Sequence, residues 1–282
     1  KIIFTSFSLF LSVTAFAQIN VTDSVKKLKE VVVRGYYNNQ PLLRSVSSVN
    51  LIDTNLIRNQ PNTSLISTFN TVPGLRMEER SPGSYRLSLR GSLLRSPFGI
   101  RNIKIYIDDF PLTDAGGNTY LNALDPQSIK SVEVYKGPEA SIFGANTGGT
   151  ILITPLSADQ NMVSASVTAG SYGLFHHTTS IQQKHKNYSF NLMEGYQKSD
   201  GFRENSAMER KYIQTNHQWN YNSKGNLKLY AFYSDLNYET PGGLTLAQFE
   251  VNPKSARPAT ATIPGAITQQ AAIYNKTVFA GI

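Results

Sequence analysis

From Met162 onward, apolar and polar residues alternate along the chain, and this pattern limits the possible folds more than any other feature. Val163, Ala165 and Val167 would point to one side of an extended chain, while Ser164 and its counterparts at every second position would point to the other. A period of two with one apolar and one polar side is typical of a β-strand whose faces meet different surroundings. The pattern therefore predicts strands that are apolar on one face and wet on the other.

The same alternation recurs in later segments, which are separated by two kinds of connection. Short turns are predicted at residues 170–173, 184–187 and 222–226, and longer loops at 199–210 and 241–270. The segments are about ten residues long, which is longer than most strands of soluble proteins and typical of strands that cross a bilayer. Short turns on one side and long loops on the other, with tyrosines near strand ends, favour an outer-membrane β-barrel. A soluble β-sandwich is the alternative, since a half-buried sheet shows the same alternation.

Composition and the first residues agree with an exported membrane protein. Charged residues make up 16% of the chain, against about 25% in typical soluble domains, and the formal net charge is +8. The absence of Cys excludes disulfides, thiolate metal sites and a cysteine nucleophile. Residues 1–17 combine Lys1, an apolar run and Ala15-Phe16-Ala17. They predict an export signal cleaved after Ala17, with a buried amphipathic helix as the alternative.

The middle of the chain, from about residue 29 to 155, carries the signals of a small α+β domain. Strands are predicted at residues 85–90, 102–107 and 150–154, and a helix at residues 62–69. Asp125 stands where it can cap a short helical turn before a further strand. Asp108 and Asp109 follow a strand and precede Phe-Pro, which is typical of a hairpin turn rather than a metal pair.

These segments occur in an order that resembles the plug domain of TonB-dependent outer-membrane receptors. In chain order the motifs are LKEVVVRG, VPGLR, RLSLRG, IKIYIDDFPL and LDPQSIKSVEVYKGPEASIFGANTGGTILITP. The resemblance implies an α+β plug domain followed by the first strands of an antiparallel transmembrane β-barrel. The implied domains are a signal peptide at 1–17, a periplasmic segment with the TonB box at 18–35, a plug at 36–155 and part of the barrel at 156–282. Because barrels that enclose a plug have about 22 strands and about six are predicted from this sequence, we expect a truncated fragment.

The resemblance also implies a coupling site near the N-terminus. The residues that match the TonB box, which an energy-coupling protein of the TonB type engages, are Lys29, Glu30, Val31, Val32, Val33 and Arg34. A β-branched triplet between polar residues suits recognition by strand addition, in which backbone hydrogen bonds provide the affinity. An ordinary first strand of the plug is the alternative, and the two roles are compatible.

Ligand contacts are expected at the plug loops that face outward in the family, which correspond to residues 92–99 and 113–120. The candidate contacts there are Arg95, Phe98, Asn118 and Tyr120. Arg95 would attract an anionic ferric chelate through its charge. Farther along, PGGLTLAQFEVNPKSARP is similar to an extracellular loop of receptors of the ferric-citrate type.

Other patterns argue against catalysis, cofactors and nucleic acid. The glycine-rich stretch at 137–149 lacks the Lys-Ser/Thr pair and the helix of a phosphate-binding loop, and the four histidines lack metal-ligand spacing. No catalytic triad or carboxylate pair can be argued, so we expect neither an enzyme nor a metal or cofactor site. Arg86 and Arg90 share one strand face and are expected to pair with carboxylates of the barrel wall, not with nucleic acid.

The resemblance thus implies an active transporter in the outer membrane of a Gram-negative bacterium, surrounded by lipid and importing a scarce ligand. An iron chelate is the first expectation, and haem, cobalamin, an oligosaccharide or a peptide are alternatives. Two other classes stay open, namely a passive porin or adhesin barrel and a soluble exported enzyme or binding protein.

Overall fold

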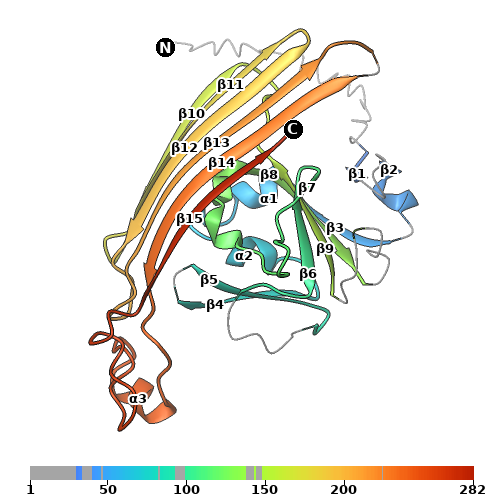
Figure 1. The fold of residues 1–282 in the computed structure, drawn as a ribbon. Helices are drawn as coiled ribbons and strands as arrows, with labels where there is room; N and C mark the ends of the chain where they lie inside the picture. The colour runs from blue at the N-terminus through green and yellow to red at the C-terminus, as the bar shows by residue number, and fades with distance from the viewer. Residues whose placement is uncertain are drawn as a thin grey trace, which may run out of the picture. The chain divides into compact units, whose positions relative to one another are not determined.

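The structure is a computed structural model that describes residues 30–33, 40–45, 47–81, 83–92, 99–137, 143, 148–223 and 225–282. The predicted export signal lies outside these ranges, as do Lys29, Arg34, Arg95 and Phe98. Contacts divide the chain into the units Lys1–Val31 and Val32–Ile282. The second unit contains an α+β domain at residues 40–155 and a curved sheet at residues 162–281 (Figure 1).

The α+β domain consists of short strands and helices in the order that the sequence predicts. Its elements, with the strand that precedes it, are β1 (Val32–Val33), β2 (Gln40–Pro41), η2 (Leu42–Arg44), β3 (Ser48–Ile52), α1 (Thr54–Arg58), α2 (Ile66–Phe69), β4 (Leu75–Ser81), β5 (Ser84–Leu89), β6 (Ile103–Ile107), β7 (Phe110–Pro111), η3 (Leu121–Ala123), η4 (Pro126–Ser128), β8 (Ile129–Lys136) and β9 (Gly149–Pro155). Five strands form a mixed sheet in the order β3-β8-β9-β6-β7, in which β6 and β9 are parallel. The strands β4 and β5 form a separate hairpin, and β1 pairs with β2.

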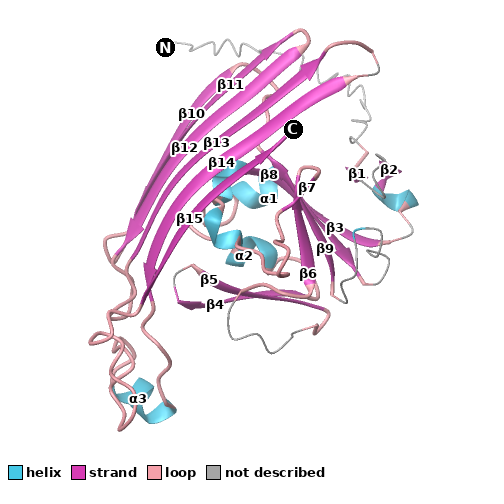
Figure 2. Ribbon diagram, viewed as in Figure 1, coloured by secondary structure: helices cyan, strands magenta, loops and turns pink. Residues whose placement is uncertain are grey.

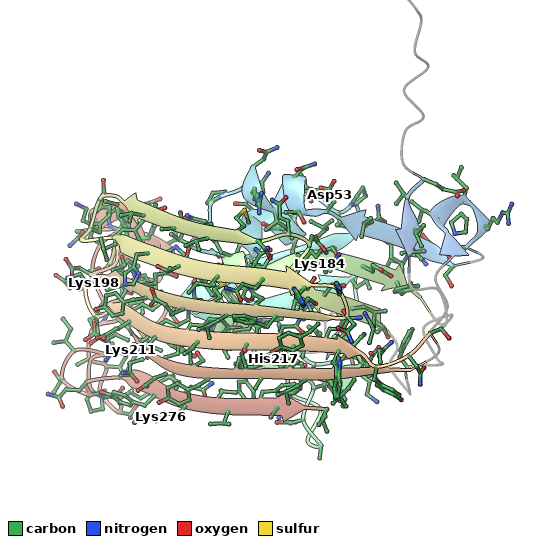
Figure 3. All side chains as sticks on the ribbon, turned by 90° about the horizontal axis from the view of Figure 1, so that it is seen from above. Asp53, Lys184, Lys198, Lys211, His217 and Lys276 are labelled. Carbon is green, nitrogen blue, oxygen red and sulfur yellow. The ribbon has the colours of Figure 1, made fainter. Side chains whose placement is uncertain are left out.

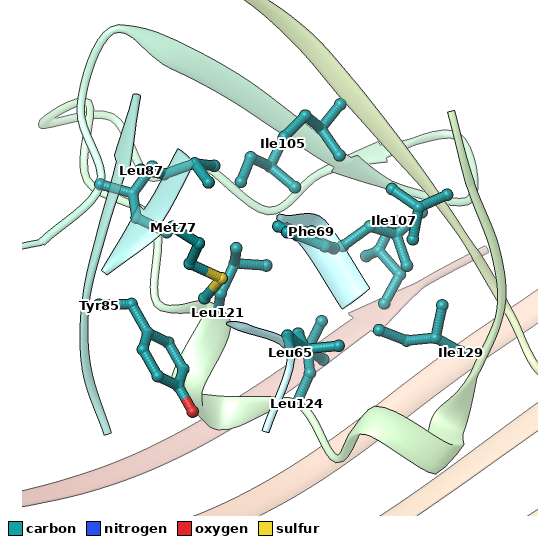
Figure 4. Close-up of a cluster of buried hydrophobic side chains, with 14 of the residues drawn as sticks. Leu65, Phe69, Met77, Tyr85, Leu87, Ile105, Ile107, Leu121, Leu124 and Ile129 are labelled. Atoms are coloured by element: carbon teal, nitrogen blue, oxygen red, sulfur yellow. The ribbon is translucent and has the colours of Figure 1, made fainter. Parts of the chain in front are cut away.

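Alternation within these strands directs apolar side chains into one core. Ile103, Ile105 and Ile107 of β6 are at most 1% exposed, whereas the intervening Lys104 is only half-buried. They belong to the same cluster as Phe69 of α2 (Figure 4). Burying each such side chain contributes about 1.5–3 kcal/mol. Of the helix predicted at residues 62–69, only the last turn, Ile66–Phe69, is helical.

Two acidic residues have the local roles that their positions predict. Asp108 begins the turn between β6 and β7 with a positive φ of 51°. Asp125 caps η4, since its Oδ1 accepts a hydrogen bond from the backbone N–H of Gln127 at 2.9 Å. Such caps satisfy helix N–H groups that have no partner within the helix.

The curved sheet has six antiparallel strands, each paired with the next along the chain. They are β10 (Met162–Ala169), β11 (Phe175–His185), β12 (Tyr188–Ser199), β13 (Met208–Asn220), β14 (Asn226–Glu239) and β15 (Ala272–Gly281). From β11 to β14 they have 11 to 14 residues, longer than typical globular strands. One end of the sheet carries short turns at 186–187 and 221–225, and the other carries the long loops at 200–207 and 240–271. The prediction of alternating turns and loops is therefore confirmed, with boundaries shifted by about two residues.

The two faces of the curved sheet are inverted relative to a soluble protein. On the face away from the α+β domain, Val163, Val167 and Val278 are about 70–80% exposed. On the opposite face, buried residues are largely polar: His176, Thr178, Ser180, Gln182, Asn191, Gln197, Arg210, Gln214 and Ser234. Figure 3 shows Lys198 and Lys211 at the end that carries the long loops. The pattern matches strands with lipid on one side and water or protein on the other.

The longest loop, residues 240–271, contains the short helix α3 (Leu246–Val251). It begins with a capping box in which Thr245 Oγ1 accepts from the backbone of Gln248, and Gln248 Oε1 accepts from that of Thr245. Figure 2 shows this helix within the long loop beyond the strand ends. Among the described residues, no helix combines the length and apolar character needed to span a membrane.

Candidate functional site

A cavity of about 680 Å³, which we call the loop-end cavity, lies where the long loops meet the α+β domain. Its lining comes from the β4-β5 hairpin, residues 119–122 and the loops that follow β12 and β14. The charged residues in the described lining are the three arginines Arg80, Arg203 and Arg257. The size is that of a small-molecule site, and the lining charge favours an anion.

Arg203 holds the long loop beside this cavity. Its Nε and Nη2 donate to the carbonyl oxygen of Ser255 at 3.1 and 2.8 Å, and its Nη1 donates to that of Gly242 at 2.8 Å. The neighbouring Glu204 accepts from the backbone N–H of Ala256 at 3.1 Å. Because its donors bind the loop, Arg203 contributes a positive charge from a fixed position.

Asn205 secures the two ends of the same loop. Its Nδ2 donates to the carbonyl oxygens of Thr240 at 3.1 Å and Ala271 at 3.0 Å. The backbone of Asn205 has a φ of 53°, a left-handed conformation that asparagine tolerates better than most residues. The loop after β12 therefore fixes the loop after β14 at both ends.

The α+β domain forms the other side of the cavity through the β4-β5 hairpin. Gly83, at the turn, has a φ of +78°, and a Cβ there would lie 3.0 Å from the ring of Tyr238 on β14. Glycine thus permits both the turn and the close approach of the two parts. Tyr85 of β5 also lines the cavity, and burial raises the pKa of its phenol.

The structure brings one of the described ligand candidates to this cavity. Tyr120 lines it and is 46% exposed. Asn118 does not belong to the lining, and its Oδ1 accepts a hydrogen bond from Arg101 Nε at 2.9 Å. Arg203 and Arg257, which the sequence did not single out, line the cavity instead. They lie in loops without a regular pattern. The resemblance of residues 241–258 to a ferric-citrate receptor loop was a signal for Arg257, and Arg203 had none.

Below the loop-end cavity, a buried cluster of Asp125, Arg210, His176 and Gln197 joins the two parts of the second unit. Asp125 Oδ2 accepts from Arg210 Nη2 and lies within hydrogen-bonding distance of His176 Nε2, each at 2.9 Å. Arg210 also donates from Nη2 to Gln197 Oε1 at 2.7 Å and from Nη1 to the carbonyl of Leu124 at 3.0 Å. Burial alone would raise the pKa of Asp125, but Arg210 and His176 favour the carboxylate and hold its pKa below the ordinary value.

Further side chains on the inward face bond to the α+β domain around this buried cluster. Gln197 Nε2 donates to the carbonyl of Thr63 at 3.1 Å, and Thr178 Oγ1 donates to Gln127 Oε1 at 2.9 Å. Tyr212 and Tyr230 pack into the hydrophobic cluster that forms the core of the domain. The contact between domain and sheet, which we call the seam, is therefore polar around the buried cluster on β11–β13 and also contains aromatic side chains of β13 and β14.

The described ion pairs across the seam join carboxylates of the domain to cations of the sheet. Lys228 of β14 contacts Asp108 Oδ1 and Asp109 Oδ2, each at 3.2 Å. Domain carboxylates thus face sheet cations here, as Asp125 faces Arg210. Arg90 instead lies near Lys136, whose pKa is lowered by burial and by that like charge. The pairing of Arg86 and Arg90 with wall carboxylates stays a prediction.

The residues proposed as a TonB box are described in part. Glu30 and Val31 are exposed. Val32 and Val33 form β1 and pair with Pro41 and Gln40, and Val33 is 1% exposed. This pairing fits the alternative of a first strand, and binding by a coupling protein stays a prediction.

Among the described residues, no group of three histidine or carboxylate side chains is placed to hold a metal ion.

Comparisons with known proteins agree with this architecture. The family described as TonB-dependent Receptor Plug Domain matches residues 41–151. The vitamin B12 transporter BtuB of Vibrio vulnificus (strain CMCP6) is 24% identical over 225 residues, which cover 78% of this chain and 35% of that protein.

Solved structures show the same fold at lower identity. The unliganded ferric citrate transporter FecA superimposes with a TM-score of 0.65 at 15% identity, over 81% of this chain and 37% of that one. The outer-membrane ferripyoverdine receptor of Pseudomonas aeruginosa, bound to ferripyoverdine, gives 0.66 at 15% identity, over 89% and 33%. The chain thus spans about a third of the length of these relatives. The matched family model, the relatives and the fold together identify residues 41–151 as a TonB-dependent receptor plug domain, and the chain as similar to TonB-dependent receptors of the outer membrane.

Proposed function

We propose that the receptor containing this chain imports an anionic iron chelate, and that the loop-end cavity contributes to its binding site. The observation that carries the proposal is the charge of the lining, in which Arg80, Arg203 and Arg257 are present and the described residues include no carboxylate. Arginine binds carboxylate groups in a planar, two-point geometry that suits chelates of the citrate type. The similarity to receptors named for ferric citrate and ferripyoverdine supports this substrate class.

Energy for import would enter through the segment at residues 29–34. In this proposal a TonB-type protein adds a strand to Val31, Val32 and Val33. The strand β1 has only two residues and pairs with only two, so its release breaks few backbone hydrogen bonds. Ligand binding must then favour the state in which the segment is accessible, because a ligand that binds both states equally shifts nothing.

Binding of radiolabelled ferric citrate to cells that produce the full-length receptor tests the substrate class. Arg257→Gln should weaken binding about tenfold or more, the loss expected for one charged hydrogen bond. Arg76→Gln is the matched control, since Arg76 is exposed and pairs with Glu78 outside the cavity. Equal binding of ferric citrate by both variants would reject the cavity as the site. Displacement of the labelled ferric citrate by cyanocobalamin but not by citrate would point to cobalamin as the alternative cargo.

Deletion of residues 29–34 tests coupling separately. Surface binding should persist while uptake stops. Undiminished uptake at a normal protein level would support a passive barrel instead.

A further inference from the structure

A second cavity lies along the same seam, toward the end of the sheet that carries the short turns. This turn-end cavity has a volume of about 350 Å³. Its lining combines α1 and η4 of the α+β domain with β10, β11 and β12 of the curved sheet. The polar lining includes Asn62, Gln127, Ser164, Thr178 and Ser180, and the described charged member is Arg58. It can therefore solvate a polar or anionic molecule.

The buried cluster lies between the two cavities along the strands. On β11, His176 belongs to the cluster, and Thr178 and Ser180 follow it on the same face and line the turn-end cavity. On β12 the order is Met193 in the turn-end cavity and then Gln197 in the cluster. The chain then reaches Arg203, which lines the loop-end cavity.

On the domain side, the same order holds over a few residues. Leu121 and Asn122 line the loop-end cavity, Asp125 belongs to the cluster, and Gln127 lines the turn-end cavity. Both surfaces of the seam thus place the cluster between the cavities, although the two surfaces come from distant parts of the sequence.

The cluster closes this part of the seam to solvent. The side chains of His176, Asp125 and Arg210 are 0%, 1% and 4% exposed. Gly195 of β12 allows the carboxylate to approach the sheet, because a Cβ there would lie 3.3 Å from Asp125 Oδ2. These buried side chains are enough to separate the two cavities.

The same contacts are suited to opening. They join side chains across the seam, so they separate without disrupting the strand ladders on either side. Two buried nitrogens of the cluster, His176 Nδ1 and Arg210 Nε, have no hydrogen-bond partner. Buried polar groups are nearly always paired, so these two favour the entry of water or of a polar ligand group when the seam loosens.

We propose that Asp125 and Arg210, braced by His176 and Gln197, form a gate between two cavities along the seam, and that a polar ligand passes from the loop-end to the turn-end cavity when they separate. The identity of that ligand rests on the proposed function, whereas the gate itself does not. Arg210 and Asp125 are positioning residues in this proposal, since they hold the domain against the sheet.

The test uses the full-length receptor in a strain that lacks the coupling protein and contains a periplasmic β-lactamase. The rate of nitrocefin hydrolysis by intact cells reports leakage through the outer membrane and needs no knowledge of the natural ligand. Arg210→Met should raise this rate severalfold. Lys228→Met is the control, because it removes a different ion pair across the seam that does not lie between the cavities.

A second substitution locates the leak. Ser164→Phe adds a large side chain to the turn-end cavity and should suppress the leak of Arg210→Met. Val163→Phe, on the outward face of the same strand, should leave the leak unchanged. A leak that persists with Ser164→Phe would overturn the route through this cavity, even if the gate opens.

The correct folding of each variant is checked in two ways. The amount of receptor in the outer membrane is measured, and so is its heat-modifiable migration in gels. If Arg210→Met does not assemble, the paired change Asp125→Asn with Arg210→Gln removes both charges and leaves no lone buried charge. That variant should also leak. Correctly assembled variants that admit no more nitrocefin than wild type would refute the gate, while the ferric citrate assay would be unaffected by that result.

Discussion

The α+β domain and the curved sheet solve opposite packing problems with similar strands. In the domain, Ile105 and Ile107 point into the apolar core, and Tyr106 between them packs against a second apolar cluster on the other face of the sheet. In the sheet, buried positions such as Thr178 and Gln214 are polar, whereas Val167 and Val278 are exposed. The alternation has the same period in both, so the difference lies in the surroundings. The domain buries apolar surface away from water, and the sheet presents its apolar surface to lipid.

The largest effect is expected in the apolar core of the domain. Phe69→Ala removes a fully buried ring and should lower the free energy of unfolding of the domain by about 4 kcal/mol. Leu43→Ala, at a residue that is 96% exposed in the same domain, should have little effect. Calorimetry of the full-length receptor in detergent would compare the two, and equal stabilities would contradict the assigned core.

The next effect is expected in the polar part of the seam. Arg210→Met leaves Asp125 buried without its main cationic partner, which should cost about 3 kcal/mol. The same calorimetric transition measures it, with Lys228→Met as the control. A negligible loss would show that polar burial in the sheet does not stabilise the domain, and the comparison between the two interiors would fail.

A smaller effect is expected on the outward face. Ile213, near the middle of β13, is 46% exposed, and Ile213→Lys should reduce the stability of the receptor in lipid vesicles by about 2 kcal/mol. Ile213→Leu should be nearly neutral. If the lysine variant is as stable as wild type in lipid, then this face does not contact the membrane.

The smallest effect is a change in pH dependence. In the wild type the pKa of Asp125 is lowered, so its stabilising contribution is present above about pH 4 and is lost only as the pH falls through the folded value. In Arg210→Met, burial dominates and raises the pKa of Asp125. The penalty of the buried charge is then relieved as the pH falls, and the variant should regain part of its lost stability relative to wild type between pH 7 and 5. A constant difference across this range would exclude Asp125 as the affected group.

The sequence predicted the elements better than the contacts between them. Strand periodicity is a local property, so the run from Met162 and the turns near 186 and 222 could be found from neighbouring residues alone. Asp125 was correctly predicted as a cap from its neighbours. Its second oxygen, however, contacts Arg210, 85 residues away. That contact depends on the register and curvature of the whole sheet, which no local pattern encodes.

The same reason explains the outcome for the charged residues. The arginines on β5 were expected to meet wall carboxylates, but the sign of an inward residue opposite them cannot be deduced without knowing which strand lies there. The ion pairs of Arg210 with Asp125 and of Lys228 with Asp108 are evident only once the strands are placed. Tyr120 lines the loop-end cavity, and its role as a ligand contact stays a prediction.

The hydrogen bonds that hold the long loop have a consequence for how such receptors diversify. Arg203 donates hydrogen bonds to the main-chain oxygens of Gly242 and Ser255, and Asn205 donates to those of Thr240 and Ala271. Every amino acid offers that same oxygen, so the anchoring hydrogen bonds do not select the side chains of the loop. Gly242 is the exception among these four, because its φ of +71° and the nearby Arg257 favour glycine. Substitutions between the anchor points can alter what the loop recognises while its attachment to the barrel rim is inherited unchanged.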